Sequence, residues 1–346
     1  MSHFLFCSFL LVYSSGLWAQ VHLTTPLEIL TFMEASPTTY EFEQLYGTPP
    51  RKNRTILPHG AYLIVSEGKE YQYSYQEVYS EEQKVWLNKA TDWLNAEQPP
   101  YPKIRRLYQR MLQAHPNDAS LHTLIGATYF EEGQWSVAQK WFDKALAINP
   151  IDYKARWLLG ELFLQQEHLD TALYTITMAH LFNRNHPRLL KRLVEVYELA
   201  GQPYYRNWGF DPLMQVYKDG ETVVVSADGI WLTYGLYKAV WEYDTDYQYI
   251  KSQQSISDYL FQQEMEAAIG TYMTYTELKR DDPRNYPAMN ALGLCLDREL
   301  VEEFVFYEIL LVDRPALAYH LTPSFRRRLL QYIASIRSMD YVIDED

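Results

Sequence analysis

A pattern of small, aromatic and proline residues recurs after 34 residues in the middle of this 346-residue chain, and it constrains the fold more than any other feature. The first copy consists of Ile125-Gly126, Tyr129, Gly133, Ala138, Phe142, Ala145-Leu146 and Pro150. Small residues suit positions where two helices cross closely, aromatic residues fill the space between the helices, and a glycine permits a tight turn. The pattern therefore predicts helix pairs that stack on one another.

A second copy follows directly, and partial copies flank the two. The second copy contains Leu159-Gly160, Phe163, Ala172, Ile176 and Ala179, with Glu167 in place of the turn glycine. The partial copies contain Ile104, Tyr108, Met111 and Pro116 upstream, and Leu193-Val194, Tyr197 and Gly201 downstream. Ser80, followed three residues later by Gln83, forms a capping box and predicts that the earliest helix begins at Glu81. The repeats thus cover about residues 81–201.

These spacings resemble those of the tetratricopeptide repeat (TPR) family. The resemblance implies a right-handed superhelix of stacked helix pairs, in which the first helices line a concave groove that is the usual binding surface. It places in this groove Ser120, Thr123, Ala127, Phe130 and Glu131 from the first full unit, and Lys154, Trp157, Glu161, Leu164 and Gln165 from the second.

The chemistry of these groove positions indicates the kind of partner. Family members that grip a peptide's terminal carboxylate carry Lys, Asn and Arg at such sites, and this chain lacks that set. Phe130, Trp157 and Leu164 instead predict an apolar and aromatic groove, which suits a peptide segment or a helix of a partner protein. The alternative is that the C-terminal helices fold back and bury this face.

The regions on either side of the repeats do not follow the pattern. Residues 21–80 are expected to be irregular, except for a hairpin in which Tyr71, Tyr73 and Tyr75 alternate with polar residues. In residues 202–340, Asp219-Gly220 between two apolar runs predicts a second hairpin. Helices are predicted from Gly229 to Trp241, and over about Ser257–Lys279, Pro287–Val312 and Pro323–Ser338.

The expected fold is therefore all-α. A tetratricopeptide-type helix-pair solenoid is continued by a C-terminal helical bundle with one or two small β-hairpins, and an acidic tail of residues 341–346 follows. No family resemblance is recognised for the C-terminal part.

The N-terminus predicts export. The run from Phe4 to Val12 is almost wholly apolar and is followed by a short segment ending in Ala19-Gln20, as in a secretory signal peptide of residues 1–20. The run is too short to cross a bilayer, and no later apolar run in the sequence is long enough, so no integral membrane segment is expected in the mature chain. We expect a periplasmic or extracellular protein of the bacterial envelope.

Composition restricts the class of partner. Hydrophobic residues make up 47% of the chain, which is enough to offset the ordering entropy of folding. The net charge of −13 disfavours nucleic acid, because the average surface repels phosphate. The 30 Tyr and 9 Trp residues either pack in the core or form a binding surface.

The sequence carries no motif that indicates catalysis, a cofactor or a metal. It has no His-x-x-x-His pair, no Gly-x-Ser-x-Gly, no phosphate-binding loop and no dinucleotide fingerprint. Cys295, which alone remains after signal cleavage, lies among leucines and is expected to be a small core residue. We therefore expect no enzymatic activity and no cofactor.

The sequence as a whole predicts an exported, non-catalytic scaffold with a protein or peptide partner. One alternative is a glycan-binding module that uses aromatic residues in the segments 71–79, 204–205 and 231–241. A further alternative is an enzyme in the C-terminal half.

Overall fold

The structure is a computed structural model that describes residues 23–47, 54–60, 62–65, 71–74, 79–206, 208–251, 256–279 and 284–339. The predicted signal peptide and the acidic tail lie outside the described residues. Within them, no helix is both long and apolar enough to cross a membrane.

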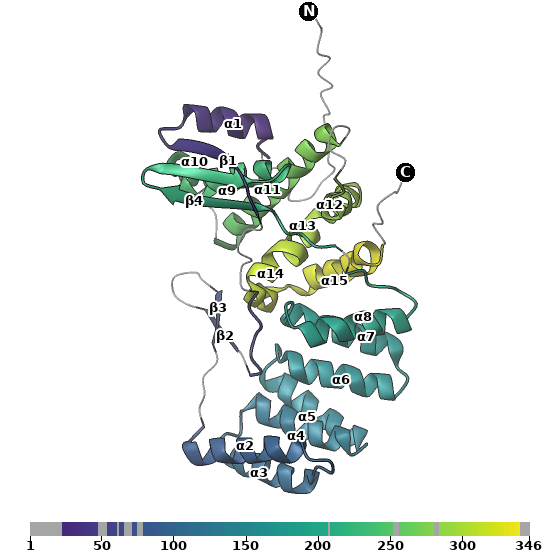
Figure 1. Ribbon diagram of the computed structural model, residues 1–346. Coiled ribbons are helices and arrows are strands. Elements are labelled where there is room, and N and C mark those ends of the chain that lie inside the picture. The colour runs from purple at the N-terminus through teal and green to yellow at the C-terminus, as the bar shows by residue number, and fades with distance from the viewer. Residues whose placement is uncertain are drawn as a thin grey trace, which may run out of the picture.

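The repeats form a solenoid of stacked helices, as predicted. Its helices are α2 (Glu81–Leu94), α3 (Tyr101–Ala114), α4 (Ala119–Glu131), α5 (Trp135–Ile148), α6 (Tyr153–Gln165), α7 (Leu169–Phe182) and α8 (Pro187–Leu199). Each helix packs against the next, and in Figure 1 they rise as layers from the bottom of the molecule to its middle. The capping box at Ser80 is confirmed, because its side chain accepts from the Gln83 amide and the Gln83 side chain accepts from the Ser80 amide.

The small residues of the repeat stand where neighbouring helices touch. A Cβ atom at Gly126 would lie 2.6 Å from Cε1 of Phe142, which is closer than real contacts allow. Gly133 adopts φ 72° in the turn between α4 and α5, and Glu167 adopts φ 61° at the same point of the next unit. Glu167 thus takes the left-handed conformation that glycine takes in the first unit, at some cost in backbone strain.

The N-terminal region is more ordered than predicted. The expectation that residues 21–80 are irregular was wrong for α1 (Pro26–Ala35) and β1 (Thr39–Gln44). β1 runs parallel to β5 (Thr222–Ala227), which also pairs antiparallel with β4 (Met214–Asp219), so the sheet order is β1-β5-β4. Tyr40 and Phe42 alternate with Glu41 and Glu43, but the side chains of β1 are mostly exposed and its partner strand lies far along the chain.

Both predicted hairpins are present. The first joins β2 (Tyr62–Val65) to β3 (Tyr71–Ser74), and the second joins β4 to β5 through Gly220 at φ 59°. α9 (Trp231–Tyr243) packs on β4 and β5, and Gly235 lets it approach closely, because a Cβ there would lie 2.6 Å from Cγ1 of Val225. α10 (Thr245–Lys251) follows, and α11 (Ile256–Leu278) packs on α9.

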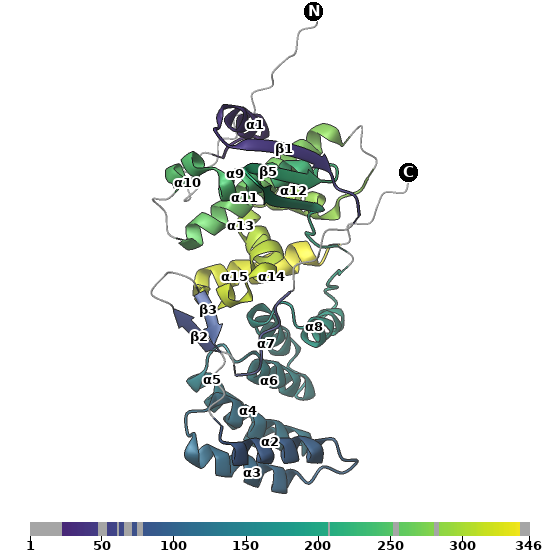
Figure 2. The ribbon, with the colours of Figure 1, turned by 60° about the vertical axis from the view of Figure 1, so that its left-hand side comes forward.

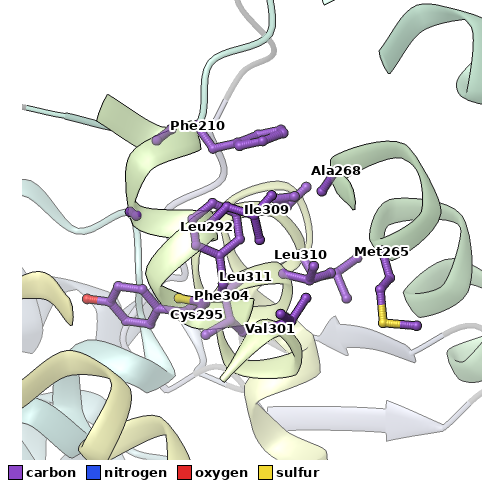
Figure 3. Close-up of a cluster of buried hydrophobic side chains, with 14 of the residues drawn as sticks. Phe210, Met265, Ala268, Leu292, Cys295, Val301, Phe304, Ile309, Leu310 and Leu311 are labelled. Atoms are coloured by element: carbon purple, nitrogen blue, oxygen red, sulfur yellow. The ribbon is translucent and has the colours of Figure 1, made fainter. Parts of the chain in front are cut away.

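The last helices complete the fold, and those from Val301 onward lie between this sheet layer and the solenoid (Figures 1 and 2). They are α12 (Pro287–Asp297), α13 (Val301–Phe304), the π-helix η2 (Val305–Leu310), α14 (Leu311–Asp313), the 3₁₀-helix η3 (Pro315–His320), α15 (Pro323–Tyr332) and the π-helix η4 (Ile333–Arg337). The prediction of one helix over 287–312 was wrong, because Glu299 at φ 56° interrupts it. Cys295 is fully buried in the core of this region, near Leu292 and Phe304 (Figure 3), as predicted.

A buried ionic network ties the C-terminal helices to the end of the solenoid. Arg337 donates to Glu308 through Nε at 2.7 Å, Tyr332 donates to it at 2.7 Å, and Nη2 of Arg184 lies 3.5 Å from Oε2 of Glu308. Burial alone would raise the pKa of Glu308, but the two guanidiniums and the Tyr332 hydroxyl hold it below its ordinary value. Because Arg184 lies between α7 and α8, this network anchors the bundle to the end of the solenoid.

Candidate binding groove and the segment at its edge

The structure places the predicted groove residues on α4 and α6. Glu131 and Gln165 are exposed and Thr123 is fully buried. The others are partly buried, namely Ser120, Ala127, Phe130, Lys154, Trp157, Glu161 and Leu164. The expectation that Thr123 is available to a partner was therefore wrong, since its hydroxyl donates to Asp152 at 2.9 Å.

Trp157 is the centre of an ordered polar and aromatic patch on α6 and α8. Its Nε1 donates to Glu161 at 2.8 Å, and Arg192 donates to both carboxylate oxygens of Glu161 at 2.8 and 2.7 Å. The ring of His186 meets the indole ring edge-on, with ring centroids 5.6 Å apart. These contacts fix the rotamer of Trp157 while its side chain remains partly exposed.

The other two apolar positions rest on the core of the repeats. Phe130 packs against a buried cluster that includes Phe142 and Leu162, and Leu164 packs against the large core cluster that runs from α7 and α8 into the C-terminal helices. The C-terminal helices meet the solenoid through contacts of η3 with α7. Phe130, Trp157 and Leu164 are neither fully exposed nor fully buried. Their burial therefore fits neither a fully open groove nor a fully covered one.

A segment that the sequence analysis did not single out lies along the edge of the groove. We call residues Arg54 to Gly60 the edge segment. Its Leu57 is 1% exposed, and the side chain of Asn183 accepts from the Leu57 amide and donates to the Leu57 carbonyl oxygen, both at 3.0 Å. Asn185 donates to the carbonyl oxygen of Thr55 at 3.0 Å. The loop between α7 and α8 thus binds an extended backbone through two asparagine side chains.

The next loop along the solenoid contacts the same segment. Nε2 of His59 lies 3.4 Å from Oδ2 of Asp152, the residue that caps α6. Burial would raise the pKa of Asp152, but the contact with His59 and the hydrogen bonds from the Ala155 amide and the Thr123 hydroxyl hold it below its ordinary value.

The contacts of the N-terminal chain recur with the period of the repeat. Asp118 and Asp152 are 34 residues apart and each caps a first helix. Asp152 pairs with His59, and Asp118 accepts a hydrogen bond from the hydroxyl of Tyr79. His59 and Tyr79 therefore contact the caps of two successive first helices in the order opposite to the order of the repeats.

A signal for this segment existed in the sequence but was weak. Leu57 precedes Pro58, and a residue before proline is biased toward an extended conformation. Asn183 stands at the same repeat position as Asn149, at the end of a second helix. Neither observation predicts that these two parts of the chain meet.

Two cavities are associated with these layers. One of about 830 Å³ lies between the edge segment at Pro58 to Gly60, the loop before α4 and the end of α5 at Ile148. The other, of about 540 Å³, lies between α9, α11 and α14, where Lys238 is paired with Glu264 at 2.6 Å.

Among the described residues, no group of three or more His, Cys, Asp or Glu side chains could hold a metal ion.

The aromatic residues of the segment 231–241, which lies on α9, are not available for stacking on a sugar ring. Trp231, Tyr234, Tyr237 and Trp241 are each at most 5% exposed, so the expectation that α9 presents them was wrong. Trp241 donates to Glu266 at 2.8 Å within the core. Aromatic residues on α9 therefore serve packing between the helix, α11 and the sheet.

Comparison with known proteins adds little to the assignment of the helical repeats. No family model matches the chain, and no curated protein matches it. Among solved structures, the first TPR of Spaghetti (RPAP3), bound to the HSP90 peptide SRMEEVD, is similar at 20% identity and a TM-score of 0.32, covering 36% of this chain and 99% of that chain. The repeat assignment rests on the helix pairs and on the residues between them.

Proposed function

We propose that this protein is an exported, non-catalytic scaffold that binds a peptide segment or a helix of an envelope protein in the groove formed by α4 and α6. The observation that carries the proposal is the state of Phe130, Trp157 and Leu164, which are held in place by the repeats yet stay partly exposed. Ordered, partly exposed aromatic and aliphatic side chains on a rigid helical surface are typical anchors of protein interfaces.

The surroundings of Trp157 support a partner with an apolar face. Glu161 accepts the hydrogen bond from the only N–H group of the indole, so Trp157 can offer a partner only the apolar surface of its ring. The ion pairs between Glu161, Arg192 and Glu195 form a charged rim beside it. An apolar anchor with a polar rim fits an amphipathic helix or an extended peptide with one bulky side chain.

Export remains part of the proposal. It is supported by the apolar run from Phe4 to Val12 and the segment that ends at Ala19-Gln20. Fractionation of cells followed by N-terminal sequencing tests it. A mature protein that begins near Val21 in the exported fraction supports the proposal, and a cytosolic protein that retains Phe4 contradicts it.

Site-specific photocrosslinking tests the groove itself. A photoreactive amino acid at Leu164 is expected to crosslink one envelope protein, and a photoreactive residue at Val137 on α5, which is 37% exposed, is expected not to. The double change Phe130→Ala with Trp157→Ala should weaken the interaction at least about 10-fold, because aromatic anchors carry most of the energy of an interface.

The matched control is Val137→Ala, which removes a comparably exposed apolar side chain from a second helix. Equal crosslinking from Leu164 and Val137, or a double variant that folds and binds as well as the wild type, would rule out the groove.

A further inference from the structure

The edge segment is held by contacts that recognise an extended peptide in general. Asn183 makes two hydrogen bonds to the backbone of Leu57, one to the amide and one to the carbonyl, and Asn185 makes a third to Thr55. A neighbouring β-strand would bind the same backbone groups. These bonds are independent of the side chains that the segment carries.

One side chain supplies the selectivity. Leu57 is fully buried, whereas the adjacent Ile56 is 49% exposed and Pro58 is exposed. His59 reaches the buried carboxylate of Asp152 at 3.4 Å. The solenoid edge thus presents backbone-binding asparagines, one enclosed position for a leucine, and a carboxylate two residues further on.

The rest of the segment is attached weakly. Arg54 pairs with Asp211 at 2.5 Å, but both side chains are more than half exposed, and such surface pairs contribute little. Short segments with one buried side chain and few contacts open locally without unfolding of the whole protein. The edge segment has the features of a ligand that is covalently part of the chain.

We propose that the solenoid edge formed by the α7–α8 loop and the start of α6 is a peptide-binding site, occupied in cis by the edge segment, that takes an extended segment of a partner protein with leucine at the Asn183 position. The site adjoins the groove at Asp152, which Thr123 contacts, but it uses none of Phe130, Trp157 and Leu164, so this proposal stands whether or not those side chains bind a partner. A partner segment with leucine at this position and a basic residue two positions later matches the contacts that Leu57 and His59 make.

The test uses the full chain and a fluorescent peptide with the sequence of residues 54–60. In the wild type, the cis segment competes at an effective concentration on the order of millimolar, so the peptide should bind weakly. In the Leu57→Ala protein the cis segment is a poorer competitor, and fluorescence anisotropy should show at least about 10-fold tighter binding of the peptide. A peptide with alanine in place of the leucine should not bind.

Further variants assign the binding to the proposed site. Adding Asn183→Ala to the Leu57→Ala protein should abolish peptide binding, whereas Asn95→Ala, at the exposed end of α2, should leave it unchanged. If the folded Leu57→Ala protein fails to bind the peptide, or if binding does not depend on Asn183, the proposal is wrong.

Hydrogen exchange of the wild-type protein provides a test without a variant. The Leu57 amide should exchange at least about 100-fold faster than the slowest amides of α5, through local opening of the segment. Exchange of Leu57 only on global unfolding would mean that the segment is a fixed part of the fold and would overturn the proposal.

Discussion

The side chain of Asn183 holds the backbone of Leu57 by both its amide and its carbonyl group, at 3.0 Å each, across 126 residues of sequence. The contact joins the N-terminal chain to the loop between the last two repeat helices. Leu57 is also fully buried there, so the pair combines a backbone interaction with an apolar one. The consequences for stability can be measured.

Truncation of Leu57 should destabilise the protein. Leu57→Ala is expected to lower the free energy of unfolding by about 2–3 kcal/mol, because a buried leucine loses its transfer free energy and leaves a cavity. Ile56→Ala is the matched control, since Ile56 is half exposed, and should cost less than about 1 kcal/mol. Urea denaturation measures both, and equal losses for the two variants would contradict the burial of Leu57.

Acid should loosen the contact between the edge segment and α6. The pKa of Asp152 is held below its ordinary value, so this carboxylate adds stability above its unfolded-state pKa of about 4, and that stability is lost as the pH falls through the lower folded-state pKa. Asp152→Asn should therefore reduce the loss of stability between about pH 4 and pH 2. Urea denaturation across this range is the measurement, with Asp170→Asn, at an exposed position on α7, as control. A steep acid dependence that persists in Asp152→Asn would assign the effect to other groups.

Ionisation of Glu303 should make the protein less stable as the pH rises toward neutral, which is opposite to the effect of Asp152. Burial raises the pKa of Glu303 to about 7, against the opposing effect of Arg328, which lies 2.6 Å away. A raised pKa contributes stability below the unfolded-state value of about 4.3, and this is lost as the pH rises through about 7, by at most about 4 kcal/mol.

The variant Glu303→Gln should flatten the stability profile between about pH 5 and pH 8. Glu302→Gln provides a close control, because Glu302 binds the same arginine at 2.9 Å but is partly exposed. Thermal unfolding at several pH values is sufficient. If both variants keep the wild-type slope, ionisation of Glu303 does not control stability in this range.

Cys295 should be inert in the native protein. It is fully buried, and burial raises the pKa of its thiol well above the ordinary value, so little thiolate is present at neutral pH. A thiol reagent such as Ellman's reagent is expected to react with Cys295 only after unfolding in urea. The Cys7→Ser background ensures that any signal comes from Cys295, and a rapid native reaction would contradict its place in the core.

The candidate site was only partly accessible to sequence reasoning. Phe130, Trp157 and Leu164 lie on the predicted helices and keep partial exposure, because helical periodicity determines which face a residue occupies. Thr123 was wrongly expected to face a partner, since it is fully buried and its hydroxyl is bound to Asp152 of the next repeat. The aromatic residues of α9 were misjudged for a similar reason, because α11 and the sheet cover them.

By itself, the sequence determined the helix pairs of the solenoid and the two hairpins. Gly126, Gly133, the capping box at Ser80 and the turn at Gly220 act on their near neighbours in the chain, and their spacing is visible in one dimension. Only the tertiary structure decided that β1 joins β5 and that Leu57 lies against Asn183. Such pairings depend on surfaces that exist only after the helices have packed, so no local pattern in either partner encodes them.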